Sequence, residues 1–482
     1  MLDSRYLTVS MVLAGILLAG CAGITPPPAH DTELMECRQL FRNVDTAVAA
    51  AGVQDHGPYP LTGFPYLRIN RFYASFRDEL DDADRFDAWA GRLAALDAEA
   101  RRIELQNLPA AEATRFANDV SERLERCRER LLTADLDTPE ERTRLRRQAR
   151  VPDDYLIGRR ALGLYPLTAL FIAAGISLLH EESRQTFATP LAELPLAGTL
   201  QRRAPPRGDP LASAEVRAIL QRSLDPLGIP VPTATELGRL FDTFAPVWEV
   251  DVVDGNDRIG MPAWDNGRLL VDTAHPTLFR KLSYTRFHGR VLLQLNYIVW
   301  FPARSGNDIY AGQFDGINWR VTLGPDGTPW LYDAMHNCGC YHKFFPSRQL
   351  RLRRDLSGLY FETPLLPQLA PADGPLILRI AHRTHYIQRL YRGGQMPSTQ
   401  LMAWQDYDLL RSLPADHGHR SMFGAAGIVP GSQRPERFIL WPTGVRSPGA
   451  MRQWGRHATA FVGRRHFDDP GLIEALFEQA GP

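Results

Sequence analysis

The chain has 482 residues, of which 44% are hydrophobic and 23% are charged, and its formal net charge is zero. This composition is ordinary for a globular protein, and the length suggests two or three domains. A neutral chain generates no overall field that would attract nucleic acid, so we expect no nucleic-acid partner.

The first twenty residues have the pattern of a signal peptide. A short apolar run from Leu7 to Ala19 follows Arg5 and is too short to span a bilayer. The run closes in Leu18-Ala19-Gly20-Cys21, which resembles the lipobox of bacterial lipoproteins. The resemblance implies that residues 1–20 are removed and that Cys21 carries the lipid. Because Ala22 rather than aspartate follows, it also implies the outer membrane, and we expect the anchored protein to face the periplasm.

Two alternatives to this interpretation are an ordinary secreted protein cut near Ala22 or Gly23, and a cytosolic protein with an apolar N-terminal helix. Residues 21–30 contain Pro26-Pro27-Pro28 and predict an extended tether between the lipid and the folded part. The partner expected first is therefore the membrane, reached through the lipid anchor, and then an envelope protein.

Residues 31–150 predict a helical domain, a bundle of four or five helices. Apolar residues recur at helix spacing, as in Leu34, Cys37 and Phe41. Thr138-Pro139-Glu140-Glu141 is a helix-start signal, because a capping side chain precedes proline and two acids at the first turn.

Four cysteines remain if Cys21 is lipidated, and an oxidising envelope favours their pairing. They allow three connectivities, of which the most local joins Cys37 to Cys127 and Cys338 to Cys340. The first bond would staple the start of the helical domain to its end.

Residues 151–246 form a mixed connecting region. Ala161 to Leu179 contains no charged residue, but Pro166 interrupts it and Arg159-Arg160 would lie on the exported side of a span. We therefore predict a buried helix or an interdomain segment, with membrane contact as the alternative. A linker at 204–210 and a helix at 212–224 follow.

Residues 247–482 predict a β-rich domain. Asp265-Asn266-Gly267-Arg268 is a hairpin signal, and Val291 to Phe301 has the apolar, β-branched and aromatic content of a central strand. A second hairpin joins 319–323 to 330–333. The fold class predicted is α+β: an N-terminal helical bundle followed by a largely antiparallel β-sheet domain with a mixed C-terminal part.

One cluster in this domain carries candidate chemistry: His336-Asn337-Cys338-Gly339-Cys340-Tyr341-His342. Imidazole and thiolate together suit zinc or copper. On a straight strand the four side chains would span about 20 Å, so either Gly339 bends the chain or other ligands arrive from elsewhere. The histidines considered for that role are His275, His288, His382 and His385, and the carboxylates considered for orienting a ligand are Asp308, Asp315 and Asp333.

Two other interpretations of the cluster remain open at this stage. One is a Cys338–Cys340 disulfide, structural or redox-active. The other is a buried turn whose histidines bond the backbone.

The sequence gives no catalytic motif: it has neither a GxSxG elbow nor a P-loop. The cluster and the segment Trp300 to Arg304 resemble those of uncharacterised bacterial envelope proteins, which implies no activity. We expect a scaffold or binding module anchored at the outer membrane. The alternative is a metal-dependent or thiol-redox enzyme with its site at His336, Cys338, Cys340 and His342, its catalytic residues being unassigned.

Overall fold

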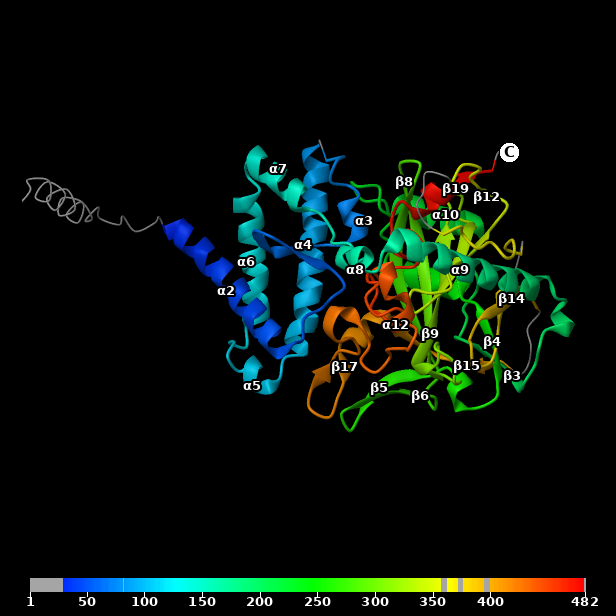
Figure 1. Ribbon diagram of the computed structural model, residues 1–482. Helices are drawn as coiled ribbons and strands as arrows, with labels where there is room; N and C mark the ends of the chain where they lie inside the picture. The colour runs from blue at the N-terminus through cyan, green and yellow to red at the C-terminus, as the bar shows by residue number, and fades with distance from the viewer. Residues whose placement is uncertain (1–28, 81, 357–361, 372–375, 394–398, 481–482) are drawn as a thin grey trace, which may run out of the picture.

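The computed structural model describes residues 29–80, 82–356, 362–371, 376–393 and 399–480 (Figure 1). The expected signal peptide, Cys21 and nearly all of the expected tether lie outside these residues. Within them the protein is α+β. Helices are interspersed with strands rather than confined to the N-terminal part, since a hairpin interrupts the first helices and further helices lie between residues 157 and 244.

The N-terminal elements pack around one apolar core. Phe41, Trp89, Leu93 and Leu131 are among its fully buried side chains. The predicted start at Thr138 is present, because its side chain accepts a hydrogen bond from the backbone N–H of Glu141 at 3.3 Å. The elements are α2 (Ala29–Ala51), β1 (Tyr59–Leu61), β2 (Phe64–Ile69), α3 (Arg71–Ala74), α4 (Ala83–Gln106), α5 (Ala110–Ala113), α6 (Val120–Asp135) and α7 (Pro139–Gln148).

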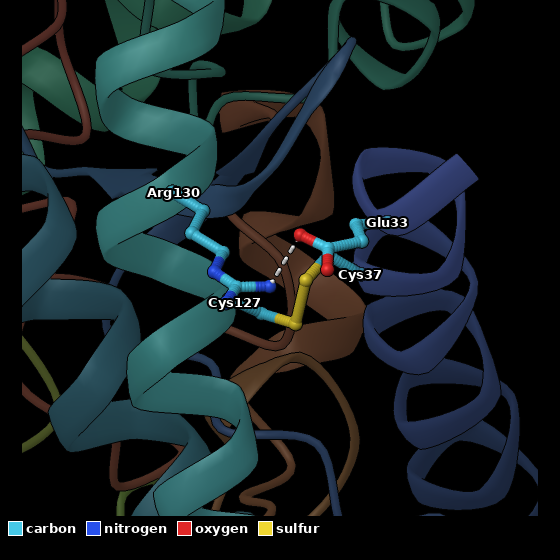
Figure 2. The surroundings of a disulfide bond; sticks show 4 residues. All are labelled: Glu33, Cys37, Cys127 and Arg130. Carbon is cyan, nitrogen blue, oxygen red and sulfur yellow. Dashed lines mark hydrogen bonds and ion pairs between the residues drawn. A yellow bond between two sulfur atoms is a disulfide. The ribbon is translucent and has the colours of Figure 1, made fainter. Parts of the chain in front are cut away.

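A disulfide bond joins Cys37 of α2 to Cys127 of α6, with their Cα atoms 5.2 Å apart (Figure 2). An ion pair between Glu33 and Arg130, 2.9 Å long, links the same two helices beside it. The first of the two expected pairings is therefore present, and it ties α2 against α6.

Two sheets form the rest of the molecule. The larger has the strand order β11-β10-β9-β8-β7-β16, and the smaller β14-β13-β4-β3-β15. The strands of the larger sheet are β7 (Thr277–Phe287), β8 (Arg290–Arg304), β9 (Gly312–Leu323), β10 (Pro329–His336), β11 (Lys343–Pro346) and β16 (Ala403–Asp406). Those of the smaller sheet are β3 (Thr199–Ala204), β4 (Val247–Val252), β13 (Leu376–Ile380), β14 (Ile387–Arg392) and β15 (Gln400–Leu401). Three short pairs complete the strands: β5 (Met261–Asp265) with β6 (Arg268–Asp272), β12 (Leu350–Leu352) with β19 (Phe477–Gln479), and β17 (Leu413–Pro414) with β18 (His419–Arg420).

The two sheets share a core. Alternate side chains of β8 and β9, such as Tyr297 and Trp319, are buried together with Trp248 of β4 and Leu378 of β13. β8 is an interior strand, as its composition predicts. The Asn266-Gly267 hairpin is also present, since both residues have positive φ, 48° and 73°, between β5 and β6.

The opposite face of the larger sheet is polar. Lys281, Asn296, Arg320 and Asp333 stand opposite one another in a single row across β7, β8, β9 and β10. The C-terminal segment covers this face, since Thr285 and Arg320 donate hydrogen bonds to the backbone carbonyls of Pro470 and Phe467.

The apolar segment 161–179 is not buried, and that prediction is wrong. It forms the end of α8 and most of α9, and within α9 only Ser183 and Phe187, near its C-terminal end, are buried. Leu162 is 82% exposed and Phe171 is 81% exposed. Among the described residues, no helix combines the length and apolar character needed to cross a membrane. The remaining helices are α8 (Ile157–Leu162), α9 (Tyr165–Ala188), α10 (Ser213–Arg222), α11 (Ala234–Phe244), α12 (Arg437–Leu440) and α13 (Leu472–Leu476).

Candidate functional site

The predicted His-Cys cluster is the connection between β10 and β11. β10 ends at His336 and β11 begins at Lys343, so residues 336–342 must reverse the chain. Gly339 makes the reversal possible with a φ of 88°, and its N–H donates to the carbonyl of His336 at 2.7 Å. A side chain at Gly339 would also collide with the backbone of Ala458, whose oxygen lies 2.6 Å from the Cβ position. The glycine therefore bends the chain, as a compact cluster requires.

The bend does not bring the four candidate ligands together. His336 Nδ1 lies 3.1 Å from Asp315 of β9, whereas His342 Nε2 lies 2.7 Å from Asp333 of β10. Throughout the part of the chain that the structure describes, no group of three or more His, Cys, Asp or Glu side chains could hold a metal ion. The structure therefore does not bring His336, Cys338, Cys340 and His342 together as the single zinc or copper ligand set that the sequence predicts, because the two imidazoles contact different carboxylates.

Cys338 and Cys340 are free, buried thiols, so the second expected disulfide is not formed. A bond between cysteines separated by one residue would close a very small ring, which strains the geometry that disulfides prefer. A hydrogen bond with Cys338 and burial together raise the pKa of the Cys340 thiol well above its usual range. The thiolate is the attacking form of cysteine, so Cys340 is held in its unreactive form.

Asp315 is the centre of a fully buried polar network. Besides His336, its carboxylate contacts His385 Nδ1 at 2.8 Å and lies 3.5 Å from Arg434 Nη2. The other ring nitrogen of His385 lies 3.5 Å from Asp257. Carboxylates and imidazoles thus alternate from Asp257 through His385 and Asp315 to His336.

The charges in this network follow from its contacts. Burial would raise the pKa of Asp315, but His336, Arg434 and His385 together hold it well below its usual range. Burial lowers the pKa of His336 to about 4 despite Asp315, so the pair consists of a carboxylate and a neutral imidazole at neutral pH. The bonds of His385 to two carboxylates outweigh burial and raise its pKa.

A second buried group surrounds Asp333. Arg320 holds this carboxylate with two hydrogen bonds of 2.9 and 2.6 Å, and His342 makes the third contact. Burial lowers the pKa of His342 to about 4, so it too is neutral at neutral pH. Asp315 and Asp333 therefore contact histidines as expected, although no group of three metal ligands forms around these histidines among the described residues. Asp308 instead pairs with Arg383 at 3.3 Å.

The other histidines considered as ligands do not join the cluster, except His385. His275 and His288 are exposed and lie beside Asp272 and Glu474. His382 has a side chain that is 42% exposed and lies 3.7 Å from Asp251.

A cleft of about 200 Å³ lies between the helical part and the larger sheet. Tyr73, Lys281, Tyr284, Asp408 and Trp454 are among the residues that line it. Its lysine already has a partner, because Lys281 Nζ lies 3.1 Å from Asp408.

An apolar surface is the other conspicuous feature. It consists of Leu162, Leu164, Leu167, Leu170 and Phe171 on α8 and α9, with Phe438, Ile439 and Trp441 on α12 and the turn that follows it. The two segments are in contact, since Arg160 Nε donates to the carbonyl of Thr443 at 2.7 Å and Gly163 packs on Pro442. Phe438 is 69% exposed, so the surface is uncovered on both segments.

Comparison with known proteins adds no assignment. No protein-family model matches the chain, and neither a curated protein nor a solved structure is significantly similar to it.

Proposed function

We propose that the protein is a membrane-attached binding module of the cell envelope, lipidated at Cys21 and facing the periplasm from the outer membrane. The apolar surface carries this proposal. Large apolar patches on soluble proteins mark sites that another surface covers. Here the covering surface is the bilayer to which the lipid holds the chain.

The form of the apolar surface favours lipid over a protein partner. On α9, Leu167, Phe171 and Leu178 lie on one outward face over a length of about 16 Å. Among the described residues no helix is long and apolar enough to span, so we propose that this face rests in the membrane interface. Two exposed aromatic residues, Phe438 and Trp441, belong to the same apolar surface, and aromatic residues are enriched at membrane interfaces. Arg437, stacked 4.7 Å from the Phe438 ring centroid, supplies a cation for lipid phosphates.

The N-terminal region 31–150 has a separate proposed role. We propose that it acts as a helical bundle that meets an envelope protein partner, while α8, α9 and α12 carry the membrane surface. An enzyme that uses Cys338 or Cys340 has less support, because the Cys340 thiol resists ionisation and the expected metal ligands diverge.

The proposal is tested by binding to lipid vesicles. The mature chain with Cys21→Ser, which removes the lipid, is sedimented with vesicles of phosphatidylethanolamine and phosphatidylglycerol. We expect Leu170→Ser/Phe171→Ser to weaken partitioning at least tenfold, because two large apolar side chains leave the interface. The control, Leu401→Ser, replaces another exposed leucine, 67% exposed on β15, and should bind as the unaltered chain does.

Two further results decide the outcome. Absence of vesicle binding, together with dimers that the double substitution abolishes, would replace the membrane by a second copy of the chain. Radiolabelled palmitate should be incorporated into the wild-type chain in cells, and Cys21→Ser should abolish the label. Unchanged labelling would refute the lipid anchor.

A further inference from the structure

We propose that the protein binds an oxyanion, a phosphate or carboxylate group, at a site formed by Arg304, Lys343, Tyr341 and Tyr386 beside the Asp315 network. The site is independent of the apolar surface. It rests on two buried cations that have no carboxylate partner.

Arg304 is the first of these cations. It is only 4% exposed at the end of β8. One of its terminal nitrogens, Nη1, donates to the hydroxyl groups of Tyr341 and Tyr386, both at 3.3 Å. Its Nε is buried and has no hydrogen-bond partner. Among the described residues no carboxylate pairs with it, although buried arginines are almost always paired.

Lys343 is the second cation. It opens β11 and is also only 4% exposed. Its ammonium group lies 5.1 Å from the ring centroid of Tyr386 and 5.9 Å from that of Tyr341, and no described carboxylate pairs with it. Lys281, the only other lysine in the sequence, has Asp408 at 3.1 Å. Lys281 therefore has a carboxylate counter-ion, whereas Lys343 has none among the described residues.

The two cations share one location. Arg304 Cζ lies 5.2 Å from the Tyr386 ring centroid and 5.7 Å from that of Tyr341, so both cations adjoin the same pair of rings. His336 packs edge-on against these rings as well, at 5.0 and 5.6 Å. An anion here would meet a guanidinium, an ammonium and two phenol groups, which is a donor set suited to phosphate or carboxylate oxygens.

The two carboxylates that act on these cations, Asp315 and Glu436, do not neutralise the positive charge of the site. Asp315 is occupied by His336, His385 and Arg434. Burial raises the pKa of Glu436 to about 7, so this group carries only part of its charge at neutral pH. An uncompensated buried cation is costly, and an anionic ligand would remove that cost.

The tyrosines of the site reach the protein surface. Tyr341 and Tyr386 are only partly buried. Tyr310, whose ring centroid lies 5.3 Å from the Arg304 guanidinium, is 37% exposed at the rim. A small anionic group can therefore approach between the tyrosines.

Calorimetric titration of the whole mature chain tests the proposal. The probes are inorganic phosphate and acetate, each compared with sodium chloride at the same ionic strength. We expect saturable binding of phosphate or of acetate, weakened at least tenfold by Arg304→Gln and by Lys343→Met. Arg290→Gln is the matched control, because Arg290 is exposed at the other end of β8 and should leave binding unchanged.

Folding of the variants is checked by circular dichroism and by their unfolding midpoints without anion. Lys343→Met should keep or raise the midpoint, since it replaces an unpaired buried cation by an apolar side chain of similar length. Added phosphate or acetate should then raise the midpoint of the wild type and not that of the variant. Absence of saturable binding to both probes, or equal binding by both variants, would overturn the proposal.

Vesicle binding distinguishes the source of the anion and separates this proposal from the previous one. If Lys343→Met binds free phosphate weakly but binds vesicles normally, the ligand is a soluble anion. If it also loses vesicle binding, the ligand is a lipid phosphate. Failure of the apolar-surface test leaves the titration result unaffected.

Discussion

At the residue scale, two aspartates decide where the histidines of the β10–β11 turn point. Asp315 and Asp333 are fully buried, and each holds one histidine of the turn and one arginine. A buried carboxylate is tolerated only when its charge is paired and its oxygens are bonded. Removal of either aspartate would leave an arginine buried without its partner.

Asp333→Ala should therefore be strongly destabilising. Arg320 loses two hydrogen bonds and His342 loses one, and breaking such a buried pair costs about 3–5 kcal/mol. The free energy of unfolding in urea measures the loss. Asp209→Ala, at an exposed position in the linker, should stay within about 0.5 kcal/mol of the wild type. A loss below about 1 kcal/mol for Asp333→Ala would contradict the structural role given to this carboxylate.

The sequence identified the histidines of the site by residue type, but not their surroundings. The sequence predicts possible metal ligands, His336 and His342, and carboxylates that could orient them, Asp315 and Asp333, because residue type and position are visible along the chain. Arg304 and Lys343 were not predicted, because an unpaired cation is recognised only when its three-dimensional neighbours are known. The rarity of lysine was the one available signal for Lys343.

At the element scale, the sequence predicts those helices, strands and turns that a short stretch of residues specifies by itself. β8, the Asn266-Gly267 hairpin and the start of α7 at Thr138 are all present where their residues indicate. The smaller sheet was missed because β4 pairs with β3 on one side and with the distant β13 on the other. α9 was misplaced because an apolar pattern does not reveal whether the chain itself covers it.

The bond between α2 and α6 gives a prediction at this scale. Cys37 and Cys127 are 90 residues apart, so the bond removes much of the freedom of the unfolded chain. Cys37→Ser/Cys127→Ser should lower the free energy of unfolding by about 4–5 kcal/mol in the chain-entropy model. Urea unfolding measures the change, with Cys338→Ser/Cys340→Ser as the comparison for thiol removal without loss of a bond. An unchanged stability of the first variant would show that packing alone fixes α2.

At the scale of the whole molecule, ion pairs connect the helical part to the C-terminal segment. Asp55 lies 2.6 Å from Arg411 and accepts a hydrogen bond from Gln453, and Arg71 pairs with Asp468 at 3.1 Å. These contacts hold the helical part and the C-terminal segment together beside the polar face of the larger sheet. Because they involve charged groups, the stability of the molecule depends on pH.

We predict that stability falls as the pH is lowered from about 6.5 to about 4. Burial lowers the pKa of His336, His342 and His457 to about 4. The unfolded chain therefore binds these protons first, which removes up to about 3 kcal/mol per histidine across that window. The unfolding midpoint in urea at pH 7, 5.5 and 4.5 measures the effect.

Buried groups with raised pKa values act in the opposite direction. Burial raises the pKa of Glu436 to about 7, so its contribution is present at low pH and is lost as the pH rises from about 4.5 to about 7. His385, whose pKa is raised by its carboxylate partners, likewise favours the folded state in acid. We expect the histidines with lowered pKa values to dominate, and His342→Gln should flatten the dependence. A midpoint that is constant or rises toward pH 4.5 would refute this assignment of charges.

The position of the bonded cysteines has a consequence for how the protein is made. A chain that emerges N-terminus first presents Cys37 and Cys127 long before Cys338 and Cys340. In the export that we propose, oxidation would join the early pair while the later pair has yet to appear. Order of emergence would then protect the two late thiols from wrong partners.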